Sequence, residues 1–217
     1  MKAEALLGEM DSLYPADFFL CSESIPYAKD KAEAIKKGTK HFLPDFSCLL
    51  AEEKFSDVSL AWNEDGLMGC VSIEKPFEAS FFPEYTKGDC VEIFIDTRDN
   101  KEMSFASSFC HVFVFFAKET DGVFVEEVTR FRMEDTHPLC NPEDIHLEAT
   151  LQKSSYKLFF SLPKEVLHGY DPLQFSRLGF AYRIHRYKGA AAYFPFSSKA
   201  FDPLQNPSLW ASLTLTK

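Results

Sequence analysis

The sequence predicts an all-β protein, an antiparallel β-sandwich of the jelly-roll or immunoglobulin-like type with one short helix and an N-terminal extension. Beyond residue 40, short runs of alternating apolar and polar residues are separated by polar turns, the pattern of half-buried strands in a sandwich. The 23 Phe residues outnumber the 2 Trp and 8 Tyr together, and Phe favours pleated, half-buried surfaces. With 217 residues, of which 46% are hydrophobic, the chain is long enough to bury a substantial core.

The first 40 residues differ in composition and residue pattern from the rest of the chain. Residues 28–37 are rich in helix formers and end at Gly38, which favours a helix that stops there. The apolar face of this helix is thin, so we expect it to lie on the surface of the main body. We therefore expect residues 1–40 to form a partly helical or irregular extension and residues 41–217 to form the sandwich.

The strands follow from the alternation and from the turn residues between the runs. Residues 63–66 end in Gly66, which favours a hairpin between the first two strands. A short helix opens at Pro163 and closes at Gly169. We expect strands at residues 57–62, 67–73, 90–96, 109–117, 123–133, 145–151, 156–162, 177–186 and 209–215.

The most informative strand is the one at residues 90–96. One of its faces carries Val91, Ile93 and Ile95, and the opposite face carries Glu92, Phe94 and Asp96. A face with two carboxylates and an aromatic ring is suited to binding a polyol or a hard cation. The alternative is an ordinary solvated sheet face.

Charge and cysteine usage restrict the partners and the compartment. The formal net charge of −10 argues against binding to a nucleic-acid backbone. The six cysteines are scattered without a Cys-x-x-Cys pair, and no signal peptide is recognisable at the N-terminus. No window approaches the ~20 apolar residues that span a bilayer. We expect reduced, mostly buried thiols in a cytoplasmic protein with no membrane partner.

Segments 58–67, 88–96, 156–167, 177–184 and 206–215 follow one another along residues 41–217. In this order they resemble the family 9 carbohydrate-binding modules and their DOMON-like relatives. The resemblance implies a β-sandwich, often supported by calcium, that binds sugar ends without catalysis and is usually attached to an enzyme.

The sugar-binding members of that family clamp a pyranose ring between two exposed tryptophans. Here the only tryptophans are Trp62 and Trp210, and both lie in apolar strand contexts that favour the core. We therefore expect a carbohydrate ligand to be recognised by loop aromatics and by charged residues on the strands, which hydrogen-bond sugar hydroxyls well. The candidate ligand-binding residues are Phe82, Tyr85, Glu92, Asp96, Arg98, Arg183 and His185. The alternative for the aromatics is that Phe81 and Phe82 plug the end of the sandwich.

Metal sites are possible but not indicated by a motif. The polar clusters Asn63/Glu64/Asp65 and Asp96/Asp99/Asn100 offer oxygen ligands for calcium, although neither matches an EF-hand. Zinc would draw on Cys110, His111, His137 and Cys140, and only if the loop with His137 folded over the strand with His111. Otherwise we expect His111 to be a hydrogen-bonded histidine on a mixed sheet face. We assign no metal ligand and no cofactor.

Catalysis is not expected, and we assign no catalytic residue. The sequence has no Gly-x-Ser-x-Gly elbow, no phosphate-binding glycine loop and no His-Glu-x-x-His motif. Glu92 and Asp96 lie four residues apart on one strand face, roughly 13 Å, which is too far for a glycosidase pair. The alternative to a sugar-binding module is a protein-interaction or scaffolding sandwich that has lost the sugar site, with a protein partner or a homodimer.

Overall fold

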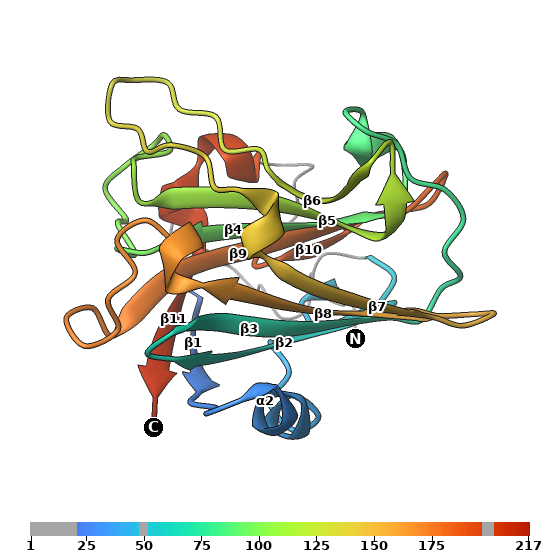
Figure 1. Cartoon of the computed structure of the whole chain (residues 1–217), viewed down its shortest axis with the longest axis horizontal. Coiled ribbons are helices and arrows are strands. Elements are labelled where there is room, and N and C mark those ends of the chain that lie inside the picture. Colours follow the sequence, from blue (N-terminus) through green and yellow to red (C-terminus); the bar gives the residue numbers. More distant parts are fainter. Residues whose placement is uncertain (1–20, 48–51, 197–201) are drawn as a thin grey trace, which may run out of the picture.

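The computed structural model describes residues 21–47, 52–196 and 202–217, which form a sandwich of two β-sheets (Figure 1). This confirms the predicted fold class. The larger sheet has the order β1-β11-β9-β4-β5-β6, with β10 added beside β9, and the smaller sheet has the order β2-β3-β8-β7. The larger sheet contains β1 (Ser22–Pro26), β4 (Cys90–Asp96), β5 (Cys110–Thr120), β6 (Val123–Glu127), β9 (Arg177–His185), β10 (Ala192–Phe194) and β11 (Ala211–Thr216). The smaller sheet contains β2 (Ser56–Asn63), β3 (Gly66–Ile73), β7 (His146–Leu151) and β8 (Tyr156–Pro163).

The described residues contain one complete short α-helix and several single 3-10 turns. The helix α2 (Lys31–Gly38) covers the outer face of the smaller sheet (Figure 1). The 3-10 turns are η2 (Tyr85–Lys87), η3 (Pro142–Asp144), η4 (Lys164–Val166), η5 (Pro203–Gln205) and η6 (Pro207–Leu209). The short helix expected between Pro163 and Gly169 is therefore the single turn η4.

The helix α2 lies where the sequence predicts a surface helix. Asp30 caps its N-terminus by accepting the N–H of Glu33, and Ala34 packs with Ala61 and Met68 of the smaller sheet. At Gly38, an added Cβ would lie 2.5 Å from the Ser59 hydroxyl, so only glycine allows this close approach of the helix to the sheet. The thin apolar face is thus enough to attach the helix.

The predicted N-terminal extension also contributes to the sandwich. Strand β1 pairs in parallel with β11, from Ser22 opposite Ser212 to Pro26 opposite Thr216. Its sequence, Ser-Glu-Ser-Ile-Pro, has a single large apolar residue and ends in Pro, so alternation gave no signal for it. Residues 1–20 of the predicted extension lie outside the described residues.

Strand β6 is shorter than predicted, because it ends at Glu127 rather than at residue 133. The hydroxyl of Thr129 accepts the N–H of Val112, so a side chain replaces the backbone carbonyl that would continue the ladder. The chain then runs through residues 128–141 without helix or strand before it reaches η3.

The core lies between the two sheets and is filled by aromatic rings. Phe115 of β5 stacks on Phe160 of β8 across the layers, with ring centroids 4.9 Å apart. Trp62 is 3% exposed and Trp210 is 1% exposed, and their indole N–H groups donate to the carbonyls of Thr216 and Pro203. Both tryptophans therefore belong to the packed interior, as the sequence predicts, and neither forms an exposed platform.

The outer face of the larger sheet is covered, which corrects the interpretation of the Glu92, Phe94 and Asp96 face as solvated. All three side chains are buried. Phe94 packs in a second apolar cluster with Phe196 and Trp210, beneath the segments that follow β6 and precede β11. Loops, rather than water, cover this part of the sheet.

Cys21, Cys70, Cys90, Cys110 and Cys140 are free thiols in the described part of the chain. Cys48 lies outside the described residues. No helix among the described residues is both long and apolar enough to cross a membrane.

Candidate functional site

The antiparallel pairing of β4 and β9 brings three of the predicted ligand-binding residues together. Glu92 lies directly opposite Arg183, and His185 lies two residues further along β9 on the same face. Both oxygens of the Glu92 carboxylate are used. Arg183 Nη2 donates to Oε1 at 3.0 Å, Arg183 Nε donates to Oε2, and His185 Nε2 lies 2.6 Å from Oε2.

In this group the Glu92 carboxylate is more deeply buried than the two basic side chains. The Glu92 side chain is 0% exposed, whereas the side chains of Arg183 and His185 are each 11% exposed. Burial raises the pKa of Glu92, but the hydrogen bonds from His185 and Arg183 outweigh it and hold that pKa below its ordinary value. Glu92 is therefore a buried carboxylate that fixes two basic side chains, each of which still reaches solvent.

The predicted aromatic residues Tyr85 and Phe82 lie on the same sheet face but are packed. Tyr85 is buried, and burial raises its pKa to about 12. Phe82 is half-buried, with its ring edge-on to Phe116 at 6.3 Å between centroids. Phe82 packs on the outer face of the larger sheet.

Other aromatic residues, which the sequence interpretation did not select, are more accessible. Tyr193 of β10 lies directly opposite Arg183 and is partly exposed. Phe81, 39% exposed, contacts the ring of Tyr187 at 5.9 Å, and the N–H of Tyr187 donates to Asp89 at the start of β4. These rings lie beside or beyond Arg183 and His185. Residues 192–194, Ala-Tyr-Phe, have no alternation that would have indicated Tyr193.

Asp96 and Arg98 belong to a different place, which corrects their grouping with Glu92. The carboxylate of Asp96 accepts the N–H groups of Arg98 and Asn100 and so shapes the turn after β4. Burial outweighs these bonds and raises the pKa of Asp96. The guanidinium of Arg98 lies 4.3 Å from the ring centroid of Phe109 and 3.8 Å from that of Phe175. Both residues hold loops together at the end of the sheet.

The two predicted calcium clusters are engaged by other protein groups. Asp99 pairs with Lys101 at 2.7 Å and accepts a hydrogen bond from Ser212. In the other cluster, Asn63 Oδ1 accepts the N–H of Asp65, and Glu64 pairs with Lys217 at 2.7 Å. The oxygens of these clusters stabilise turns and bind lysines.

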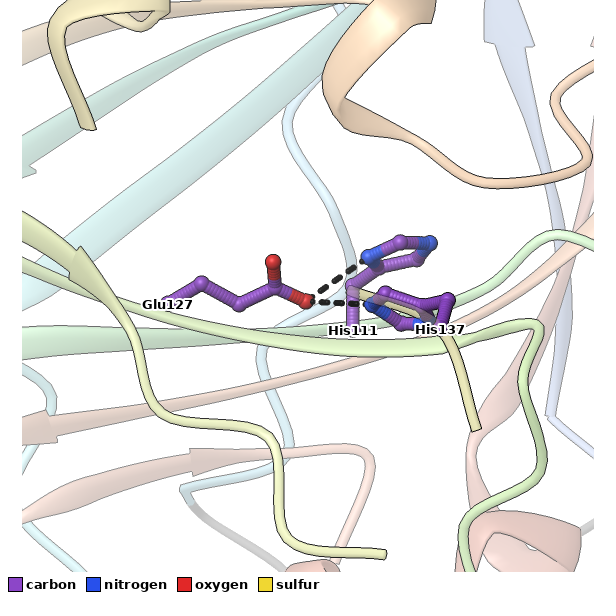
Figure 2. Close-up of side chains that lie close together, drawn as sticks. All are labelled: His111, Glu127 and His137. Carbon is purple, nitrogen blue, oxygen red and sulfur yellow. Dashed lines mark hydrogen bonds and ion pairs between the residues drawn. The ribbon is translucent and has the colours of Figure 1, made fainter. Parts of the chain in front are cut away.

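A second polar cluster lies at the inner face of the larger sheet, where β5 and β6 meet the segment 128–141 (Figure 2). His111 Nδ1 and His137 Nε2 each lie 2.9 Å from the same oxygen of Glu127, Oε1. The loop with His137 does fold over the strand with His111, which was the condition for a zinc site. The third member is a carboxylate, however, and Cys110 points to the opposite sheet face, where it packs with Phe94.

Glu127 was missed by the sequence interpretation because it lies in a Glu-Glu pair at a predicted strand, a pattern typical of a solvated edge. Its register opposite Phe113 places it on the inner face. Burial raises the pKa of Glu127, but hydrogen bonds from His111 and His137 outweigh it and hold that pKa far below its ordinary value. At His111, burial outweighs the attraction of Glu127 and lowers the pKa.

Comparison with known proteins identifies the architecture. A family 9 carbohydrate-binding module from Caldicellulosiruptor kristjanssonii in complex with cellotriose matches with a TM-score of 0.64 at 14% identity, covering 90% of this chain and 93% of that chain. A family 9 module from the same organism in complex with glucose matches with a TM-score of 0.56 at 16% identity, covering 74% and 76%. No protein-family model and no curated protein match the sequence. At these identities the likeness concerns the fold, and the chain has the β-sandwich fold of the family 9 carbohydrate-binding modules.

Proposed function

We propose that this protein binds a saccharide without transforming it, on the outer face of the larger sheet, through Arg183 and His185. One observation carries the proposal. The buried Glu92 carboxylate fixes two basic side chains on neighbouring positions of one strand face, and both side chains still reach solvent. Donors that are fixed before the ligand arrives lose little entropy on binding.

The chemistry of these donors suits sugar hydroxyls. Arg183 Nη1 lies 3.8 Å from Asp202, too far for a full hydrogen bond, so it remains available to an incoming oxygen. His185 uses Nε2 toward Glu92, which leaves Nδ1 to face a ligand. Charged donors form the stronger hydrogen bonds to hydroxyl oxygens.

Partly exposed rings near these donors supply an apolar surface for a sugar. Tyr193 lies opposite Arg183, and the pair Phe81 and Tyr187 lies beyond the end of β9. The fold adds support, because two solved proteins of the same architecture were captured with cellotriose and with glucose. These complexes make glucose and β-linked glucose oligomers the first ligands to examine.

Isothermal titration calorimetry and amide NMR with glucose, cellotriose and a panel of other oligosaccharides test the proposal. We expect saturable binding to the wild-type protein and a loss of about fivefold or more in His185→Ala, since a hydrogen bond contributes about 1 kcal/mol. His146→Ala is the matched control, because His146 is an exposed histidine on β7 that pairs with Glu148. A panel without heat and without amide shifts would contradict the proposal and favour the protein-interaction alternative.

A further inference from the structure

The cluster of His111, Glu127 and His137 has no role in the proposed sugar site, yet its three ionisable side chains are almost completely buried and share one contact atom. Their side chains are 1%, 1% and 2% exposed. They come from three separate segments, β5, β6 and the irregular segment 128–141 (Figure 2). Burying three such groups is costly unless they are fully paired or hold an ion.

A hydrogen bond of His137 determines which ring nitrogen carries the proton and which has the lone pair that faces Glu127. His137 Nδ1 lies 2.6 Å from the carbonyl oxygen of Ser108, which can only accept, so Nδ1 carries a proton. In the neutral imidazole, Nε2 is then a lone pair that points at a carboxylate oxygen 2.9 Å away. That contact is repulsive unless a proton or a metal ion lies between the two atoms.

The Glu127 oxygen Oε1 is already supplied with a proton donor. The Thr129 hydroxyl accepts the N–H of Val112 and therefore donates to Oε1 at 2.8 Å. The other oxygen, Oε2, accepts the N–H of Cys140 at 2.8 Å. The carboxylate is thus oriented by two groups outside the cluster, and the histidine nitrogens converge on an oxygen that is not short of hydrogen bonds.

His111 also directs a ring nitrogen at the Glu127 carboxylate. Its Nδ1 faces Glu127, and its Nε2 is buried without a hydrogen-bond partner within the described residues. His111 Nδ1 and His137 Nε2 therefore point at one shared centre, the oxygen Oε1 of Glu127.

We propose that His111 Nδ1, His137 Nε2 and the Glu127 carboxylate bind one zinc ion, which anchors the segment 128–141 to the larger sheet. The three ligand atoms lie within 4.8 Å of one another. A tetrahedral zinc ion with bonds of about 2.0–2.1 Å needs ligand atoms about 3.3 Å apart, a spacing between the 2.9 Å contacts and the 4.8 Å span of the cluster, so side-chain rotations would bring the three atoms to it. Two imidazoles and one carboxylate suit zinc, whereas calcium and magnesium prefer oxygen ligands alone.

Aromatic rings enclose the proposed site. The ring of Phe131 lies edge-on to His137 at 4.8 Å, and the ring of His168 stacks on His137 at 5.6 Å. His168 is exposed, so the cluster lies one ring below the surface. Long segments without secondary structure are uncommon in compact domains, and this one returns to the sheet at His137 and Cys140, next to the proposed ion.

Metal analysis of the full chain tests the proposal. The protein is unfolded in urea with EDTA and refolded with ZnCl2, with MgCl2 or without metal, and bound zinc is measured after desalting. We expect about one equivalent of zinc in the wild-type protein, no retained magnesium, and a higher melting temperature only after refolding with zinc. Less than a tenth of an equivalent of zinc would overturn the proposal.

Variants of the cluster test which side chains bind the zinc ion. We expect His137→Gln and Glu127→Gln to weaken zinc binding by about 100-fold or more, and His146→Gln to bind like wild type. Equal zinc binding by all four proteins would overturn the assignment. Should the first two variants fail to fold, X-ray absorption at the zinc edge of the wild-type protein decides. We expect two imidazole ligands, and a spectrum without imidazole would contradict the site.

Discussion

Two buried glutamates, one on each face of the larger sheet, hold basic side chains in different ways. Glu92 on the outer face binds Arg183 and His185, which are each 11% exposed. Glu127 on the inner face binds His111 and His137, which are at most 2% exposed. A similar carboxylate therefore presents donors to the outside at one site and encloses them at the other. The first arrangement suits a ligand that arrives from solvent, and the second suits an ion that becomes part of the fold.

The largest expected loss of folding stability is at the inner site, at Glu127. Glu127→Gln replaces the buried carboxylate with a neutral amide, whose NH2 group cannot accept hydrogen bonds, so we expect it to lower the free energy of unfolding by about 3–5 kcal/mol. Urea unfolding followed by circular dichroism measures this. The control is Glu126→Gln, a half-buried neighbour opposite Val114 on the other sheet face. We expect that control to stay within about 0.5 kcal/mol of wild type.

A smaller loss of folding stability is expected at the outer site, at Glu92. Glu92→Gln removes the bidentate partner of Arg183, but Arg183 and His185 can turn toward water, and Asp202 lies near Arg183. We expect a loss of about 1.5–3 kcal/mol in the same unfolding experiment. If Glu92→Gln cost as much as Glu127→Gln, the outer site would be as closed as the inner one, and the comparison would fail.

The outer site also predicts a pH dependence. Because the folded protein holds the pKa of Glu92 below its ordinary value of about 4.5, its stabilising contribution is present above that pH and is lost as the pH falls through the folded pKa. The groups that face Glu92 are Arg183, His185, Tyr85 and Cys90. Thermal melts should show a gap between wild type and Glu92→Gln that narrows as the pH falls below about 4.5. A gap that widened below that pH would contradict a lowered pKa of Glu92 in the folded protein.

The smallest effect is expected at Arg98, which the sequence grouped with the sugar-binding residues. Its guanidinium lies over the rings of Phe109 and Phe175, and Arg98→Lys should cost about 1 kcal/mol through weaker stacking. Calorimetry should show unchanged affinity for any saccharide that the wild-type protein binds. A selective loss of sugar binding in Arg98→Lys would return Arg98 to the site.

The sequence predicted the sandwich and the faces of its strands, because alternation determines which side chains share a face. That is why Glu92, Arg183 and His185 were placed on functional faces before their pairing was known. Alternation does not reveal what covers a face, so the burial of Glu92 beneath loops was not predictable. Glu127 could not be recognised, since its role depends on the return of His137 from a segment without secondary structure. Strand β10, with three residues, is too short to be distinguished from a loop, and Tyr193 was missed with it.

The most direct test of the sugar-binding face is histidine-selective NMR of the wild-type protein during titration with cellotriose. The six histidines include one at the proposed sugar site, His185, and two in the inner cluster, His111 and His137. We predict that the ring signals of His185 shift with saturation, while those of His111, His137 and the exposed His146 stay in place. Ring signals of His185 that remain unchanged at saturating cellotriose, while other residues report binding, would contradict the assignment of the outer face as the ligand site.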